Sequence, residues 1–330
     1  MSFPVSRRQL VASSMAALLP TVYVGARAQS YPSRPIRIVV PSPAGGAGDV
    51  IVRAVGQRLA TELGQPVVVE NRAGAGAMIG MRYVAKSVPA DGYTFVFATN
   101  AAVTIGPMAS KSAGFSPQDD LTPVVGLTRL PLFICVPASS PYRTISELIQ
   151  AGRRPDNKLS FGTSGVGALS HLTGLAINSI TGASFQHIPY KGGAPLSLAL
   201  MAGELTYALL VGGDSIPHVK TGKMRMLAVT DSRPTKLLPE VPTMKDAGYP
   251  DFPSLSSWFS LFAPARTPSD IVQTVSRKVA TILTEPEFTA RFEKIVAEAW
   301  PANPSELGEA LRSETVLFSK IITQAGITLE

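Results

Sequence analysis

The stretch IRIVVPSPAGGAGD, residues 36–49, leads from a short apolar run into a loop of glycine and other small residues. Apolar residues then recur at helical spacing between residues 51 and 63, until Gly64 ends the pattern. This order predicts a β-strand, a tight loop and an α-helix. The first N–H groups of such a helix lack intrahelical acceptors, and the helix dipole favours negative charge there, so the loop is a candidate anion site.

A second corner of the same kind follows roughly 120 residues later. The stretch LSFGTSGVG, residues 159–167, again leads from an apolar run into a glycine-rich loop, and a helix-like segment comes after it. Two such corners in one chain suggest two lobes that face one ligand, each presenting backbone N–H groups to it.

Strand-like and helix-like segments alternate along the chain. The first lobe continues with strand-like runs at 65–70 and 93–98 and a helix-like segment between them. The pattern restarts with a strand at 132–136, and a capping box from Thr144 to Glu147 then opens a helix. This alternation predicts an α/β fold in which each lobe is a doubly wound, mostly parallel sheet, with the ligand at the carboxyl ends of its strands.

The chain order predicts a discontinuous first lobe. The mature chain exceeds what one core usually holds, and a last strand near residues 257–262 is followed by a helical tail. We expect this tail to pack back on the first lobe. Lobe 1 then comprises residues 29–127 and 260–330, and lobe 2 comprises residues 128–259. The two chain crossings would form a hinge that closes around a ligand in the cleft between the lobes.

Residues 1–28 have the composition of an export signal. A pair of arginines begins the segment, residues 10–24 are largely apolar, and residues 26–28 form an A-x-A cleavage site. We expect cleavage near Ala28 and a periplasmic location, reached by the twin-arginine or the Sec route. A membrane anchor is the alternative, but the apolar stretch is interrupted by serine and proline and is shorter than the roughly 20 residues of a span.

Charge and cysteine content exclude several classes of protein. Loss of the leader removes three arginines and lowers the formal net charge from +7 to +4, which suits an anionic small ligand. Only 16% of the residues are charged, too few for a nucleic-acid footprint. Cys135 is the only cysteine, so an intramolecular disulfide and a multi-cysteine metal site are both excluded, and its apolar neighbours predict a core position.

Ordered motifs along the whole mature chain resemble one protein family. They are YPSRPI at 31–36, LGQPVVVENR at 63–72, PADGYT at 89–94, HIPYKGG at 187–193 and SWF at 257–259. This set resembles the Bug-type solute-binding proteins of tripartite tricarboxylate transporters. The resemblance implies a two-lobed periplasmic binding protein of type II that takes a small carboxylate, has no catalytic activity, cofactor or metal, and works with membrane permease subunits. We expect a monomer.

In that family, backbone N–H groups and hydroxyls of the two glycine loops hold the ligand carboxylate. The resemblance therefore nominates as ligand-binding residues Ser42, Ala44, Gly45, Gly46 and Asp49 in the first loop, Thr99 and Asn100 after the third strand, Thr163, Ser164, Gly165, Val166 and Gly167 in the second loop, and Tyr190. A carboxylate in direct contact with an anion would be repelled, so we expect Asp49 to cap the helix or to orient a bridging water.

Two candidate site residues depart from the family pattern. Many relatives carry a hydroxyl residue where this chain has Ala168, and many carry aspartate near Leu210. Each departure removes a polar contact. We therefore predict a ligand less polar at its distal end than citrate or aspartate, such as an aromatic or short aliphatic monocarboxylate.

An exported enzyme and a ligand sensor are the alternatives to a transport receptor. Residues 74–80 resemble a dinucleotide fingerprint, but Asp91 precedes the next strand instead of ending it, and GTSGV at 162–166 lacks the last glycine of a nucleophile elbow. The three histidines lack the spacing of a metal site, and His171 is expected to brace the second loop. Transport and sensing for a membrane kinase both stay open.

Overall fold

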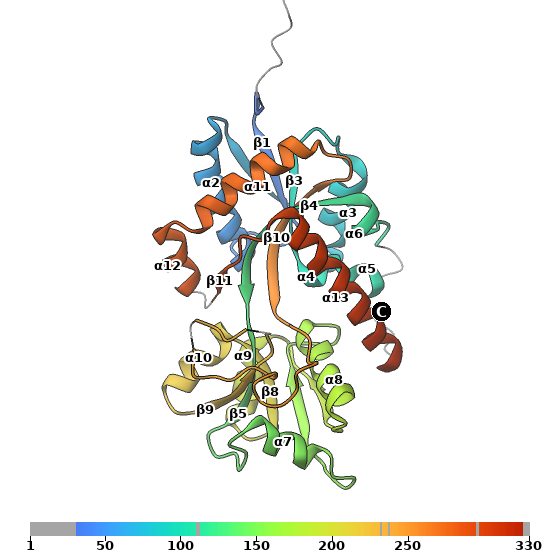
Figure 1. The fold of residues 1–330 in the computed structure, drawn as a ribbon, viewed down its shortest axis with the longest axis vertical. Helices are drawn as coiled ribbons and strands as arrows, with labels where there is room; N and C mark the ends of the chain where they lie inside the picture. Colours follow the sequence, from blue (N-terminus) through green and yellow to red (C-terminus); the bar gives the residue numbers. More distant parts are fainter. Residues whose placement is uncertain (1–30, 110–112, 232, 237, 295–296, 326–330) are drawn as a thin grey trace, which may run out of the picture.

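The protein folds into two α/β lobes, one above the other in the view of Figure 1. A computed structural model describes residues 31–109, 113–231, 233–236, 238–294 and 297–325. The predicted signal peptide, residues 1–28, lies outside the described residues. Among the helices of the described part, none is both long and apolar enough to cross a membrane.

The first lobe is built on a sheet with the strand order β11-β4-β10-β3-β1-β2. Its strands are β1 (Ile36–Val40), β2 (Val67–Asn71), β3 (Thr94–Thr99), β4 (Leu121–Leu130), β10 (Ser257–Pro264) and β11 (Glu298–Ala299). Strands β1, β2 and β3 pair in parallel, and β4 runs in their direction because both β4 and β3 are antiparallel to β10. The short β11 is antiparallel to β4.

Helices cover both faces of this sheet. They are α2 (Ala47–Leu63), α3 (Met78–Ser87), α4 (Asn100–Val103), α5 (Ile105–Ala109), α6 (Pro117–Asp120), α11 (Ser269–Leu283), α12 (Pro286–Lys294) and α13 (Pro304–Ala325), with a short 3-10 turn, η1 (Ala75–Ala77). Apolar residues of α2 and α11 share one core with β1 and β3, and those of α3 and the first half of α13 share another. The helices after β10 thus pack on the first lobe.

The second lobe repeats this plan with the order β7-β6-β8-β5-β9. Its elements are β5 (Leu132–Pro137), α7 (Ile145–Gly152), β6 (Ser160–Thr163), α8 (Leu169–Thr181), β7 (Gln186–Pro189), α9 (Gly193–Met201), β8 (Tyr207–Val211), α10 (Gly212–Lys220) and β9 (Met224–Val229). The expected capping box is confirmed, because the Thr144 hydroxyl and the Glu147 carboxylate cap each other's backbone N–H at the start of α7. Cys135 is fully buried in β5, as predicted.

Apart from the short β11, one strand in each sheet runs against the others, and that strand enters directly from the other lobe. Strand β5 follows β4 and is antiparallel to β8 and β9, whereas β10 returns from lobe 2 and is antiparallel to β3 and β4. The remaining long strands of each sheet share one direction, so both sheets are mostly parallel. The antiparallel strands were not anticipated from the sequence.

The strands of the first sheet reach past the boundaries expected from the sequence. Strand β4 extends to Leu130 and β10 begins at Ser257, whereas the expected boundaries were 127/128 and 259/260. Strand β4 itself was missed, because Pro123 interrupts its apolar pattern and proline lacks a ladder donor. Pro123 lies where β4 pairs with β10, next to an irregularity in the register of the two strands. The sheet accommodates the proline at this position.

Helix α13 contacts both lobes. Leu307 and Leu311 belong to the apolar core of lobe 1, whereas Phe318 and Ile321 are buried in the core of lobe 2 beside α8. The helix therefore bridges the lobes in addition to the two chain crossings (Figure 1).

The glycine at position 48 is required by the packing of α2 on the first sheet. A Cβ built on Gly48 would lie 2.5 Å from the Phe97 ring of β3. We expect Gly48→Ala to lower the free energy of unfolding by about 1–3 kcal/mol through overpacking. Gly308→Ala is the matched control: position 308 in α13 has room for a methyl group, so alanine should stabilise the helix by up to about 1 kcal/mol. Urea denaturation of both variants tests this, and equal effects would contradict it.

Candidate ligand-binding site

A cavity of about 290 Å³ lies between the two lobes. Its walls come from the carboxyl ends of β3, β6 and β8 and from the amino ends of the antiparallel strands β5 and β10. The lining residues are Thr99, Asn100, Ala101, Leu132, Ser164, Ala168, Leu169, Ser170, Gly193, Leu196, Leu209, Leu210, Val211, Asp214 and Ser257. Because the strand ends of both lobes meet here, the cavity occupies the edge where α/β sheets bind ligands.

Five of the predicted site residues line this cavity. Thr99 and Asn100 enter from lobe 1, and Ser164, Ala168 and Leu210 enter from lobe 2. The Thr99 hydroxyl accepts the Ala102 N–H at 3.2 Å as the cap of α4, which leaves its own proton for a ligand. The two departures from the family pattern, Ala168 and Leu210, therefore contribute apolar surface to the cavity wall.

The second glycine loop presents two free backbone donors. The N–H groups of Gly165 and Val166 have no acceptor among the described residues. Gly165 has a φ of 148°, which side-chain-bearing residues rarely adopt, and Val166 is 62% exposed. Ser164 is held in place because its N–H donates to the Ser170 hydroxyl at 3.2 Å. The loop can therefore offer adjacent N–H groups to an anion.

A pair of stacked histidines supports this loop from behind. The rings of His171 and His187 lie 3.8 Å apart, and the Gly167 N–H donates to His171 Nδ1 at 3.2 Å. The predicted bracing role of His171 is thus confirmed. His187 Nε2 shares a hydrogen bond of 2.7 Å with the Thr163 hydroxyl, which is fully buried. Burial, followed by the neighbouring His171, lowers the pKa of His187 to about 4.

The first glycine loop lies outside the cavity lining. Ser42, Ala44, Gly45 and Gly46 follow β1, which is the parallel neighbour of β3, so the loop occupies the same sheet edge as Thr99. The N–H groups of Ala44 and Gly46 have no acceptor among the described residues, whereas the Gly45 N–H is engaged by Asp49.

Asp49 organises the first loop by accepting three hydrogen bonds. Its Oδ2 accepts the Gly45 N–H at 2.9 Å and Arg53 Nε at 3.0 Å, and its Oδ1 accepts Asn71 Nδ2 at 2.9 Å. Asn71 also donates to the Ser42 carbonyl at 3.1 Å. Asp49 is buried, and the hydrogen bond from Arg53 is the main reason that its pKa falls to about 2. The carboxylate thus ties the loop to the first turn of α2 and to β2.

Tyr190 is oriented away from the cavity. Its hydroxyl donates to Glu204 at 3.3 Å, and its N–H donates to the Thr163 carbonyl at 2.9 Å. Tyr190 therefore supports the second loop through its backbone in this structure.

Sequence reasoning missed two residues of the cavity wall, Ser257 and Asp214. Ser257 opens β10, whose direction was not foreseen. Asp214 is the third residue of α10, one turn beyond Leu210, and it is the only ionisable side chain among the described lining residues. A glycine pair followed by an acid, directly after the apolar run at 207–211, was the available signal.

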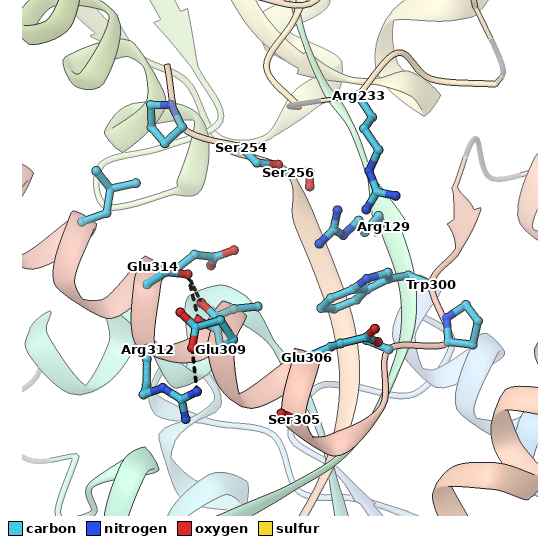
Figure 2. Close-up of a pocket in the computed structure, with 16 residues that line it drawn as sticks. Arg129, Arg233, Ser254, Ser256, Trp300, Ser305, Glu306, Glu309, Arg312 and Glu314 are labelled. Atoms are coloured by element: carbon cyan, nitrogen blue, oxygen red, sulfur yellow. Dashed lines mark hydrogen bonds and ion pairs between the residues drawn. The ribbon is translucent and has the colours of Figure 1, made fainter. Parts of the chain in front are cut away.

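A larger cavity of about 910 Å³ lies beside the hinge (Figure 2). Its charges are mixed: Arg129 and Arg233 face Trp300, while Glu306, Glu309 and Glu314 project from α13. Arg129 stacks over the Trp300 ring at 4.3 Å, and Arg312 pairs with Glu309 at 2.6 Å. Residues of the two glycine loops do not line it. This mixture gives no net preference for an anion.

Glu314 connects this second cavity with the ligand cavity. Its carboxylate accepts Trp258 Nε1 at 2.6 Å and Asn100 Nδ2 at 3.2 Å, and burial raises its pKa to about 7. Asn100 lines the ligand cavity, and its Oδ1 is buried without a partner among the described residues. Glu314 of helix α13 therefore contacts a residue that lines the ligand cavity.

Other chemistries find little support in the part of the chain that the structure describes. No group of three or more metal-ligating side chains was found there. Burial raises the pKa of the Cys135 thiol to about 12, so this thiol is not a nucleophile at neutral pH.

Residues 51–327 match the family model described as the tripartite tricarboxylate transporter family receptor. The chain belongs to this receptor family. A UPF0065 protein of Bordetella bronchiseptica is 34% identical, over 94% of this chain and 91% of the relative. The alignment with this relative is long enough to include both glycine loops, whereas the match to the family model begins after the first loop.

Solved structures agree with the family assignment. A TctC solute-binding protein from Polaromonas, solved without ligand, superposes with a TM-score of 0.82 at 29% identity, over 89% of this chain and 100% of that chain. The R. palustris protein Rpa4515, solved with adipate, superposes with a TM-score of 0.71 at 33% identity, over 90% of this receptor and 99% of that chain. The two-lobed fold is therefore that of periplasmic solute-binding proteins.

Loss of the Asp49 charge should destabilise the first loop in a pH-dependent way. A folded-state pKa near 2 means that its stabilising contribution is present above pH 4 and is lost as the pH falls through about 2. We expect Asp49→Asn to lower the free energy of unfolding by about 1–3 kcal/mol at pH 7 and by less at pH 3. Asp270→Asn, at an exposed first-turn acid of α11, should cost only about 0.5 kcal/mol. A pH-independent loss at Asp49 would contradict this role.

The histidine pair should make the receptor acid-sensitive above pH 4. Because the pKa of His187 is lowered, the unfolded chain binds a proton that the folded chain does not, so stability is complete above pH 6.5 and falls toward pH 4. Because the ring is only half-buried and solvent screens its charge, the expected loss is about 2 kcal/mol. His187→Gln should reduce this slope in urea denaturation, whereas His218→Gln should leave it unchanged. A wild-type slope in His187→Gln would show that other groups cause the sensitivity.

Proposed function

We propose that this chain is an exported receptor that captures a small monocarboxylate between its lobes and delivers it to membrane permease subunits. Family membership supports the receptor role, and a relative of the same fold was solved with adipate. The observation that carries the proposal is the cavity at the lobe junction, which hydrogen-bond donors line from both sides.

The ligand carboxylate would be bound mainly by neutral donors. The free N–H groups of Gly165 and Val166 and the hydroxyls of Ser164 and Thr99 provide such donors without a salt bridge. Backbone donors held by packing cost little reorganisation on binding. The apolar surfaces of Ala168 and Leu210 favour a ligand with one carboxylate rather than three.

Closure would bring the first glycine loop to the ligand. Only the segments before β5 and before β10 cross between the sheets, so rotation about them would move Ala44 and Gly46 toward the cavity. Their free N–H groups would then contribute to the same carboxylate. Export through the leader at residues 1–28 and a monomeric state complete the proposal.

The site favours binding over turnover. The one hydroxyl–imidazole pair near it, Thr163 with His187, is buried away from the cavity lining. Ser164 is hydrogen-bonded to Ser170 rather than to a base. A nucleophile with its base is therefore not presented to a ligand by the described lining residues.

Native mass spectrometry of the freshly purified protein should detect a bound small carboxylate. In thermal-shift measurements, butanoate, hexanoate or benzoate should raise the melting temperature more than citrate does, because ligand binding to the folded state stabilises it. The strongest stabilisation by citrate would overturn the monocarboxylate proposal, and turnover of the bound molecule would overturn the receptor proposal.

Substitutions at Val166 test whether backbone N–H groups recognise the ligand. Replacement Val166→Pro removes the N–H and should weaken binding at least tenfold, the loss of about 1.4 kcal/mol expected for one hydrogen bond to a charged group. Val166→Ala is the matched control, since it removes only an exposed side chain and should change the Kd less than about twofold. Calorimetry with the best ligand of the screen measures both. Equal losses would mean that the side chain, not the backbone, binds the ligand.

A further inference from the structure

The carboxylate of Asp214 lies in the wall of the ligand cavity. Asp214 belongs to the first turn of α10, and its neighbours in the wall include Leu210 on β8 and Gly193 at the start of α9. A Cβ built on Gly193 would lie only 1.8 Å from Asp214 Oδ2. Glycine at position 193 therefore makes room for this carboxylate.

Among the described residues, no hydrogen bond or ion pair reaches the Asp214 carboxylate. Asp214 also makes no capping hydrogen bond at the start of α10. Several other aspartates are paired, such as Asp120 with Lys86 at 2.7 Å and Asp91 with Arg34 at 2.6 Å. A half-buried carboxylate without a donor is unfavourable. Burial accordingly raises the pKa of Asp214, while His218 on the next turn of α10 opposes this shift.

Asn100 enters the same wall from lobe 1. Its Nδ2 donates to the Ser256 carbonyl and to Glu314, and its Oδ1 is buried, so Asp214 is the acceptor that this wall offers to a ligand. The wall also contains the hydroxyls of Thr99, Ser164 and Ser257, which can donate to a carboxylate. A ligand that uses both kinds of group needs an acceptor and a hydrogen-bond donor.

We propose that Asp214 is a specificity-determining residue, which selects monocarboxylates that carry, besides the carboxylate, a hydrogen-bond donor, ammonium in preference to hydroxyl. This inference rests on the proposed function. Dicarboxylates are disfavoured, because their second carboxylate would approach Asp214 and like charges repel at short range in a partly dehydrated site. An ammonium group instead gains a charge-assisted hydrogen bond.

If Asp214 only stabilised its helix, its substitution would have a different effect on ligand binding. An acid in the first turn of a helix stabilises the helix dipole, and this effect does not depend on the ligand. Removal of such an acid changes the melting temperature of the free protein and shifts all Kd values alike. A specificity role changes the ratio of Kd values between ligands.

Two matched series of ligands test the proposal by calorimetry at pH 7. The six-carbon series is hexanoate, 6-hydroxyhexanoate, 6-aminohexanoate and adipate, and the four-carbon series is butanoate, 4-hydroxybutanoate, 4-aminobutanoate and succinate. The protein is first unfolded in urea and refolded to release any bound ligand. In at least one series, we expect the amino acid to bind at least tenfold more tightly than the dicarboxylate, with the hydroxy acid between them.

Substitution of Asp214 should remove this order. In Asp214→Asn, the ratio of the dicarboxylate Kd to the amino acid Kd should fall at least tenfold, while the Kd of the unsubstituted monocarboxylate changes less than threefold. Gly193→Ala should act in the same direction, because the added methyl displaces the carboxylate. Asp251→Asn removes an exposed charge outside the cavity and should preserve the wild-type ratios.

The outcomes separate this inference from the proposed function. Tightest wild-type binding of a dicarboxylate, or equal shifts of all Kd values in Asp214→Asn, would overturn the role of Asp214 and leave a carboxylate receptor in place. Failure of every ligand in both series to bind, with the refolded protein intact by circular dichroism, would overturn both.

Discussion

The exchange of one antiparallel strand between the two sheets is the constraint on which the rest of the structure depends. Strand β5 enters lobe 2 directly from β4, and β10 returns to lobe 1 between β3 and β4. The amino ends of these strands therefore lie beside the carboxyl ends of the parallel strands. Both ligand-binding edges face the hinge, and the cavity forms between them. Helix α13 adds a third, non-covalent bridge across the same junction.

Many of the polar side chains around the site hold the backbone of the two glycine loops in place. Asp49, Arg53 and Asn71 fix the first glycine loop, and the stacked His171 and His187 fix the second. Among the described residues, their hydrogen bonds go to the loops or to one another, so the free donors near the cavity are mainly N–H groups and hydroxyls. Such donors suit one carboxylate without the desolvation cost of a buried arginine. Asp214 is the exception, because its carboxylate lines the cavity without a hydrogen bond or ion pair from the described residues.

The sequence predicted most of the strands and helices because their signals are local. The apolar run at β1, the helical spacing of α2 and the capping box of α7 each lie within one short segment. Strand β4 was not predicted, because Pro123 interrupts its apolar pattern and because its pairing with β10 joins residues more than a hundred positions apart. The position of Asp214 in the cavity wall was not predicted, because no local pattern shows whether an acid in the first turn caps its helix or faces a cavity.

The amino-acid sequence by itself determined the two glycine corners, the α/β class and the receptor family, since each depends on the order of residues along the chain. Only the tertiary structure decided which of these residues meet. It placed Thr99 and Asn100 opposite Ser164, Ala168 and Leu210, turned Tyr190 away, and added Asp214 to the same wall. The physical reason is that a cavity between lobes depends on strand direction and strand exchange, which are set by long-range pairing rather than by local pattern.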